Sequence, residues 1–107
     1  MKLYRAVSAA EYKDFKTDQN FRTADNTIEG KQFFKSQNAV LEFVEAAVKR
    51  GYRPPYKHIL IITVENQCFN VINPESQILD GHEAITIQEE DLPGLSNCFI
   101  FEEVQNV

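Results

Sequence analysis

The chain has 107 residues, of which 43% are hydrophobic and 25% are charged, as is typical of one soluble globular domain. It carries 11 Lys and Arg against 16 Asp and Glu, and this net charge of −5 argues against a nucleic-acid partner, because phosphate backbones are bound by clustered Lys and Arg. No apolar run reaches the length of a membrane span and no secretory signal opens the chain, so we expect a cytoplasmic protein without a membrane partner.

The first elements are a strand and a short helix. Residues 2–7 alternate in polarity and predict a strand. The sequence Ser-Ala-Ala-Glu at 8–11 is a capping box, which predicts a helix running to about Phe15. Residues 17–27 are polar and predict a loop, with Phe21 as its anchor.

A strand and the main helix follow. Residues 31–35 predict a short strand, and Ser36 is a natural N-cap for the next segment. Gly51 predicts the left-handed stop of that helix, and the prolines at 54–55 forbid its continuation. The inner face is predicted by apolar residues at helical spacing: Val40, Phe43, Val44, Ala47 and Val48.

The second half predicts mostly strands. Residues 59–64, Ile-Leu-Ile-Ile-Thr-Val, form a continuous apolar run that predicts a strand covered on both faces, at the centre of the sheet. Further strands are predicted at 69–72, 84–87 and 98–104, with turns at 73–75 and 80–81 and a turn or single helical turn at 89–95, broken at Pro93-Gly94. The order predicts one α+β domain over residues 1–107, with a mixed or antiparallel sheet and two helices near the N-terminus.

Cysteine spacing gives no metal signature. Cys68 and Cys98 belong to no CxxC motif and no Cys/His cluster, so we expect no metal site. Two buried thiols in a reducing compartment are the default interpretation, and a single disulfide is the alternative.

Three positions have both a structural and a functional interpretation. Arg5 lies among apolar neighbours, so it needs either an ion-pair partner within the chain or an anionic ligand. Ser36 caps a helix, and a strand-to-helix junction can also hold an anion. Tyr52 and Tyr56 flank the two prolines, where they form either a stacking surface for a ligand or the apolar packing of a loop.

Four segments in order resemble the small bacterial members of the ADP-ribosyltransferase superfamily. They are "LYRAVSAAEY" at 3–12, "EGKQFFKSQNAVLEF" at 29–43, "HILIITV" at 58–64 and "DGHEAITIQEEDLPGLSN" at 80–97. The family opens with a Leu-Tyr-Arg-type strand and a helix, and places a late Glu at the start of a further strand. The resemblance implies an ADP-ribosyltransferase-like fold, NAD as cofactor and transfer of ADP-ribose to a protein acceptor.

The resemblance also implies site residues. Arg5 matches the first-strand Arg that contacts the phosphate or ribose of NAD, while Phe34 and Ser36 fall in the family's Ser/Thr strand and would line the cofactor site. Glu83 matches the late Glu, whose carboxylate would stabilise the positive charge that develops as the glycosidic bond breaks. Glu90, in Gln-Glu-Glu, is the second choice for that role.

The same sequence supports a non-catalytic alternative. Ala6 stands where the family has Gly, one hydroxyl is present in the Ser/Thr strand, and no Lys or Arg follows His58. These features suit a degenerate member of the fold that acts as a small binding or regulatory domain towards a protein partner. An unrelated α+β interaction domain is the third hypothesis.

Overall fold

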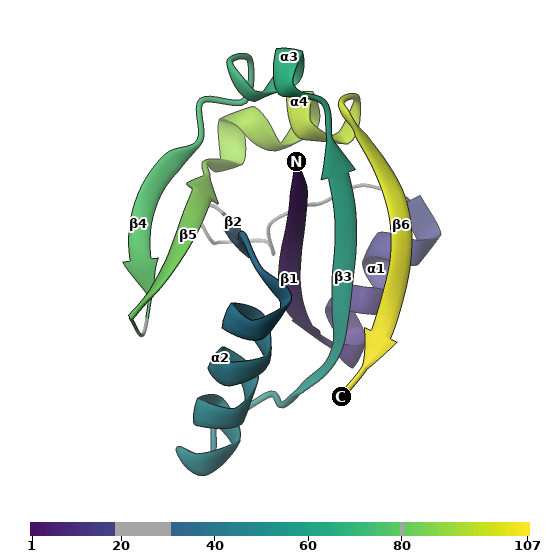
Figure 1. The fold of residues 1–107 in the computed structure, drawn as a ribbon. Coiled ribbons are helices and arrows are strands. Elements are labelled where there is room, and N and C mark those ends of the chain that lie inside the picture. The colour runs from purple at the N-terminus through teal and green to yellow at the C-terminus, as the bar shows by residue number, and fades with distance from the viewer. Residues whose placement is uncertain (19–30, 80) are drawn as a thin grey trace.

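A computed structural model describes residues 1–18, 31–79 and 81–107, and these residues form one six-stranded sheet covered by helices (Figure 1). In chain order the elements are β1 (Lys2–Ser8), α1 (Ala9–Asp18), β2 (Lys31–Phe34), α2 (Gln37–Lys49), β3 (Tyr56–Val64), α3 (Asn66–Phe69), β4 (Glu75–Leu79), β5 (His82–Ile87), the 3-10 turn η1 (Glu89–Asp91), α4 (Leu92–Ser96) and β6 (Phe99–Asn106). The chain is therefore an α+β domain, as the sequence predicts.

The sheet has the strand order β4-β5-β2-β1-β3-β6, and each pair of neighbours is antiparallel. β1 and β3 pair along the whole of β1, from Lys2 with Thr63 to Ser8 with Tyr56. β1 and β2, in contrast, pair at a single described position, Tyr4 with Phe34. The sheet therefore consists of two three-stranded blocks that meet at a narrow seam between β1 and β2.

The prediction that residues 59–64 occupy the centre of the sheet was wrong, because β3 lies next to the edge strand β6. Their predicted burial on both faces is confirmed. Leu60, Ile62 and Val64 point into one core, and Ile59 and Ile61 point into the other. An apolar run requires cover on both faces, and any interior strand can meet that requirement.

The two faces of the sheet are covered by different helices. Phe15 of α1 and the apolar residues of α4 pack on the face that carries Leu60, while α2 packs on the face that carries Ile59. Figure 1 shows α1 and α2 on opposite sides of the sheet. The pocket described below is lined mainly by residues of the α2 face, while the ion-pair network beside it includes Glu11 of α1.

Helix α2 largely follows its prediction. The Ser36 hydroxyl accepts a hydrogen bond from the N–H of Ala39 at 3.1 Å, which confirms the N-cap. Val48 is wrongly assigned to the inner face, because it is 70% exposed, and Ala39 is buried instead. Gly51 has φ +66, and the N–H of Tyr52 donates to the carbonyl of Ala47 at 3.0 Å, which closes the helix as predicted.

Helix α1 begins as predicted and ends later. The Ser8 hydroxyl accepts a hydrogen bond from the N–H of Glu11 at 3.2 Å, so the N-cap half of the capping box is present. The helix runs to Asp18, and the loop predicted for residues 17–27 therefore begins inside it. The rest of that loop, with Phe21, lies outside the described residues, as does Asp80 of the predicted turn at 80–81.

Three assignments in the second half were wrong. Residues 69–72 are not a strand, since α3 ends at Phe69 and Ile72 is a buried core residue. β4 was not predicted at all. Pro93 and Gly94 lie within α4, because a proline in the first turn removes only an N–H that has no partner in the helix. Helices are therefore not confined to the N-terminal part of the chain.

Candidate functional site

An ion-pair network around Arg5 lies at the seam between β1 and β2. Arg5 Nε donates to Glu11 Oε2 at 2.6 Å, and Arg5 Nη2 donates to Glu11 Oε1 at 2.9 Å. The third guanidinium nitrogen, Nη1, donates to the backbone carbonyl of Gln32 at 3.0 Å. Lys31 Nζ lies 3.5 Å from Glu11 Oε2. The ion pair within the chain, one of the two alternatives that the sequence left open for Arg5, is therefore present.

Local sequence explains how these groups meet. The capping box places Glu11 in the first turn of α1, directly after β1, so its carboxylate turns back towards Arg5. Arg5 then spans the seam to the backbone of β2, at a place where the two strands are no longer paired. A guanidinium suits this role because its planar fork binds a carboxylate with two parallel hydrogen bonds.

The electrostatics of the network follow from its burial. Burial alone would raise the pKa of Glu11, but the hydrogen bonds and charge of Arg5, together with Lys31, outweigh it and hold that pKa below its ordinary value. Burial and the nearby Arg5 charge lower the pKa of Lys31, which is only 8% exposed. Arg5 and Lys31 thus share the Glu11 carboxylate, and the negative charge of Asp14 also acts on Lys31.

A pocket of 190 Å³ opens beside Arg5 on the α2 face of the sheet. Its lining residues come from both strands of the seam, from α2 and from the segment before β3: Arg5, Ala6, Gln32, Phe34, Phe43, Tyr52 and Tyr56. The contacts of Arg5 with Glu11 and Gln32 use one N–H on each guanidinium nitrogen. Because each terminal nitrogen carries two, these bonds to described residues leave one N–H on Nη1 and one on Nη2 for a ligand.

Four aromatic residues also line this pocket. Phe34 lies 5.0 Å from Phe43, and Phe43 lies 5.6 Å from Tyr56, measured between ring centroids. Tyr52 stacks on Tyr56 at 5.1 Å with an interplanar angle of 15°. Burial, followed by hydrogen bonding with Tyr52, raises the pKa of Tyr56 to about 12. The Tyr56 hydroxyl is therefore kept protonated, and it is engaged with Tyr52.

The predicted site residues are distributed over the sheet. Arg5 and Phe34 share the pocket at the seam. Ser36 is exposed at the start of α2, where its hydroxyl is engaged as the N-cap. Glu83 lies on β5 and lines a different pocket, of 210 Å³, together with Lys35 and the strand β4.

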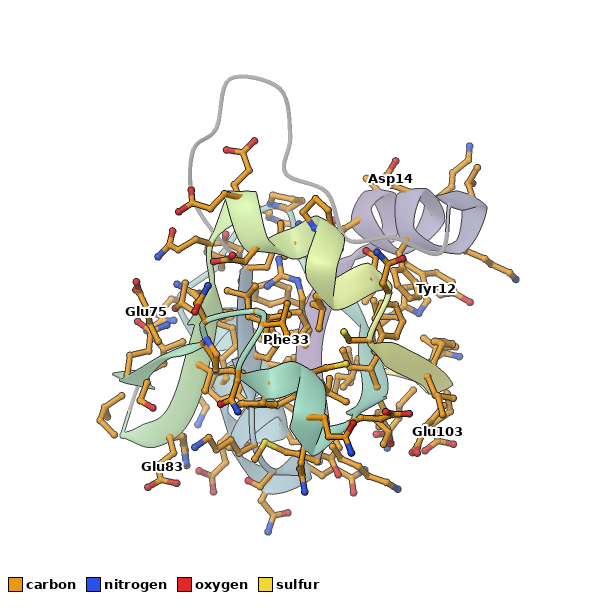
Figure 2. The ribbon with its side chains drawn as sticks, turned by 90° about the horizontal axis from the view of Figure 1, so that it is seen from above. Tyr12, Asp14, Phe33, Glu75, Glu83 and Glu103 are labelled. Atoms are coloured by element: carbon orange, nitrogen blue, oxygen red, sulfur yellow. The ribbon has the colours of Figure 1, made fainter. Side chains whose placement is uncertain are left out.

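Figure 2 shows Glu83 at the periphery of the molecule, while Phe33 lies in its interior. Neither the 190 Å³ pocket of Arg5, the 210 Å³ pocket of Glu83 nor a third hollow of 140 Å³ is lined by both Arg5 and Glu83. Glu90, the second choice, is exposed in η1. The catalytic roles of Glu83 and Glu90 and the cofactor roles of Arg5, Phe34 and Ser36 stay predictions.

The two cysteines are free thiols in this structure. Hydrogen bonding with Cys98, followed by partial burial, raises the pKa of Cys68 to about 11. Among the described residues no three His, Cys, Asp or Glu side chains are grouped as metal ligands would be. Over the same ranges, no helix has both the length and the apolar character that a membrane crossing demands.

Comparisons with protein-family models, with curated proteins and with solved structures find no match for this chain. The ADP-ribosyltransferase resemblance consequently rests on the four sequence segments alone.

Sequence reasoning missed two members of the network, Glu11 and Lys31. Glu11 was recognised only as a helix-capping residue, and its proximity to Arg5 depends on how α1 turns back at the end of β1. Lys31 gave no signal, since a Lys at the start of a strand is usually exposed. The Tyr52 and Tyr56 pair was identified as a stacking surface or loop packing, and the structure brings the pair together with Arg5 in one pocket.

Proposed function

We propose that this chain is a small binding domain that takes an anionic small molecule in the pocket beside Arg5. The observation that carries the proposal is the Arg5 guanidinium, which Glu11 and Gln32 hold rigidly while it lines an open pocket. A fixed guanidinium with donors to spare is a preorganised partner for a carboxylate or phosphate, because little side-chain entropy is lost on binding.

The charge of the network supports an anion. Arg5 and Lys31 both lie near Glu11, so a carboxylate or phosphate bound to Arg5 would be a second negative charge beside these two cations. The Tyr52 and Tyr56 side chains also line this pocket beside Arg5. The charged side chains of Arg5, Glu11 and Lys31 are each at least three-quarters buried, so dissolved salt screens their electrostatic interaction with a ligand only weakly.

Binding without group transfer is the simpler function for this pocket. Its charged lining residue is Arg5, and no carboxylate is among the residues that line it. General acid–base catalysis needs a titratable side chain within hydrogen-bond reach of the reacting group. Glu11 lies next to Arg5, but both of its carboxylate oxygens already accept hydrogen bonds from the guanidinium.

The experiment is a titration of the 15N-labelled protein with inorganic phosphate and with acetate, followed by amide chemical shifts. We expect saturable shifts at Ala6, Gln32 and Tyr56 for at least one of the two anions. Arg5→Lys should weaken this binding at least tenfold, because an ammonium keeps the charge but loses the fork. Lys13→Ala, which removes an exposed cation that lines none of the described pockets, is the matched control and should leave the affinity unchanged.

Shifts that do not saturate, or equal weakening in Arg5→Lys and Lys13→Ala, would contradict the proposal. The first outcome would mean that no anion site exists, and the second that only net charge matters. The one-dimensional spectrum of each variant checks that the fold is kept, so a loss of binding can be assigned to the side chain.

ADP-ribosyl transfer from NAD is the second candidate. The observation that favours it is that Arg5, the residue that the resemblance assigns to NAD phosphate or ribose, lines a pocket together with Phe34. The test is calorimetry with NAD, followed by NAD turnover in wild type and in Glu83→Gln and Glu90→Gln. Binding with turnover that Glu83→Gln abolishes would establish the enzyme, while unaltered turnover in both variants would remove these two residues from it.

A further inference from the structure

A second hollow adjoins the anion pocket and shares two of its walls. It has a volume of 140 Å³ and lies between the end of α2 and the start of β3. Tyr52 and Tyr56 line both hollows, so the stacked tyrosine pair is the boundary between them. The remaining lining residues of the second hollow are Ala47, Val48, Gly51, Arg53 and Pro55.

The second hollow differs from the first in character. Ala47, Val48 and Pro55 give it apolar walls, and Tyr52, which also lines it, is 48% exposed as a residue. Val48 is 70% exposed, although it belongs to a helix whose other valines are buried. An apolar residue and a tyrosine ring that stay exposed around a hollow are the features of a surface that receives a flat, apolar group.

The backbone explains why Tyr52 is held at this boundary. Gly51 adopts φ +66 and turns the chain sharply after α2, and the Tyr52 N–H is tied to Ala47. Tyr56 supports the other face of the Tyr52 ring at 5.1 Å. The Tyr52 ring is therefore held by its backbone hydrogen bond and by stacking on Tyr56, while the residue stays half exposed to solvent.

Size also suggests that the two hollows act together. Small-molecule sites usually measure roughly 300–1,000 Å³. Neither hollow reaches that range by itself, at 190 and 140 Å³, but jointly they reach its lower end. An inorganic anion would fill only the part beside Arg5 and leave the tyrosine ring uncovered.

We infer that the ligand is an anion that also carries a planar ring, with its charged group on Arg5 and its ring packed against Tyr52. This inference rests on the proposed function, since it assumes the anion site and adds the class of molecule that fills it. Tyr52 can stack on any flat aromatic ring that fits the hollow, so it selects the ring only by its size and flatness. The forked guanidinium of Arg5 selects a carboxylate or phosphate as the charged group.

The experiment compares phenyl phosphate with methyl phosphate, two phosphate monoesters that differ in the ring, by calorimetry and by amide shifts. We expect phenyl phosphate to bind wild type at least tenfold more tightly. Tyr52→Ala should reduce that ratio to about one while leaving the methyl phosphate affinity within twofold, and Tyr52→Phe should keep the ratio. Since Tyr52 is half exposed, these variants should fold.

The outcomes separate the two proposals. If both esters bind wild type equally, or if the ratio survives in Tyr52→Ala, the ring assignment is overturned while the anion site stands. If neither ester binds, the proposed function itself fails. Arg53→Ala distinguishes the two arginines: we expect the methyl phosphate affinity to be kept, and its loss in that variant would move the anion from Arg5 to the second hollow.

Discussion

Glu11 is the residue on which the electrostatics of the site depend, because it holds Arg5 and Lys31 together. Removing its charge leaves two mostly buried cations without their shared partner. We expect Glu11→Gln to lower the free energy of unfolding by about 2–3 kcal/mol at pH 7, somewhat less than a fully buried pair would lose, since the carboxylate is 24% exposed.

The pH dependence of this effect has a definite sign. The folded pKa of Glu11 lies below its ordinary value of 4.5, so its stabilisation is complete above that pH and is lost as the pH falls through the lowered value. Urea unfolding of wild type and Glu11→Gln should therefore show a gap at pH 7 that narrows towards pH 3. A gap of equal size at both pH values would contradict the charge-based account.

A matched control is available on the surface of α2. Glu45 forms an i,i+4 pair with Lys49 at 3.4 Å, and both side chains are mostly exposed. The same Glu45→Gln change should cost no more than about 0.5 kcal/mol, because water and salt screen such pairs. The comparison separates the loss of a buried charge partner from the loss of a carboxylate in general.

At the scale of the element, Ser36 decides how α2 begins. Its hydroxyl satisfies the N–H of Ala39, and an alanine there would leave that donor to water. We expect Ser36→Ala to cost about 1 kcal/mol of stability, and Ser36→Asp to retain most of it. Thermal or urea unfolding measures both.

The same variants test whether Ser36 has a second role. If Ser36 acts only as a cap, phosphate should bind to Ser36→Ala as it binds to wild type. If Ser36→Ala stays folded but no longer binds the anion or NAD, the hydroxyl belongs to the cofactor site that the family resemblance assigns to it.

At the scale of the whole molecule, the seam divides the sheet into two blocks. β1, β3 and β6 are joined by long ladders, whereas β2 is joined to β1 at Tyr4 and Phe34 alone within the described residues. We expect native-state hydrogen exchange to show amides of β4 and β5 opening at least roughly tenfold more often than those of β3, because fewer backbone hydrogen bonds tie their block to the rest.

The opposite result is also informative. Side chains from both blocks, such as Phe33 and Leu60, belong to one core cluster. Equal protection in β3 and β5 would mean that this shared core makes the sheet one cooperative unit, despite the narrow seam. The Arg5 pocket would then sit in a rigid groove rather than beside a joint between two blocks.

Much of this structure was predictable from local chemistry. The capping box at Ser8, the N-cap at Ser36, the helical apolar stripe of α2, the glycine stop at Gly51 and the buried run of β3 each depend on neighbouring residues, so the sequence alone determined them. The requirement of Arg5 for an ion-pair partner or an anionic ligand followed in the same way, because a guanidinium among apolar neighbours needs a partner.

The tertiary structure decided everything that depends on which segments meet. The fold places β3 near an edge and brings Arg5 and Lys31 to the shared carboxylate of Glu11. It also brings Tyr52 and Tyr56 to the Arg5 pocket, while Glu83 lines another. The strand β4 has no buried residue and is placed by its ladder with β5, which its own sequence does not reveal. Contacts between distant residues depend on the geometry of the whole sheet, which no local pattern contains.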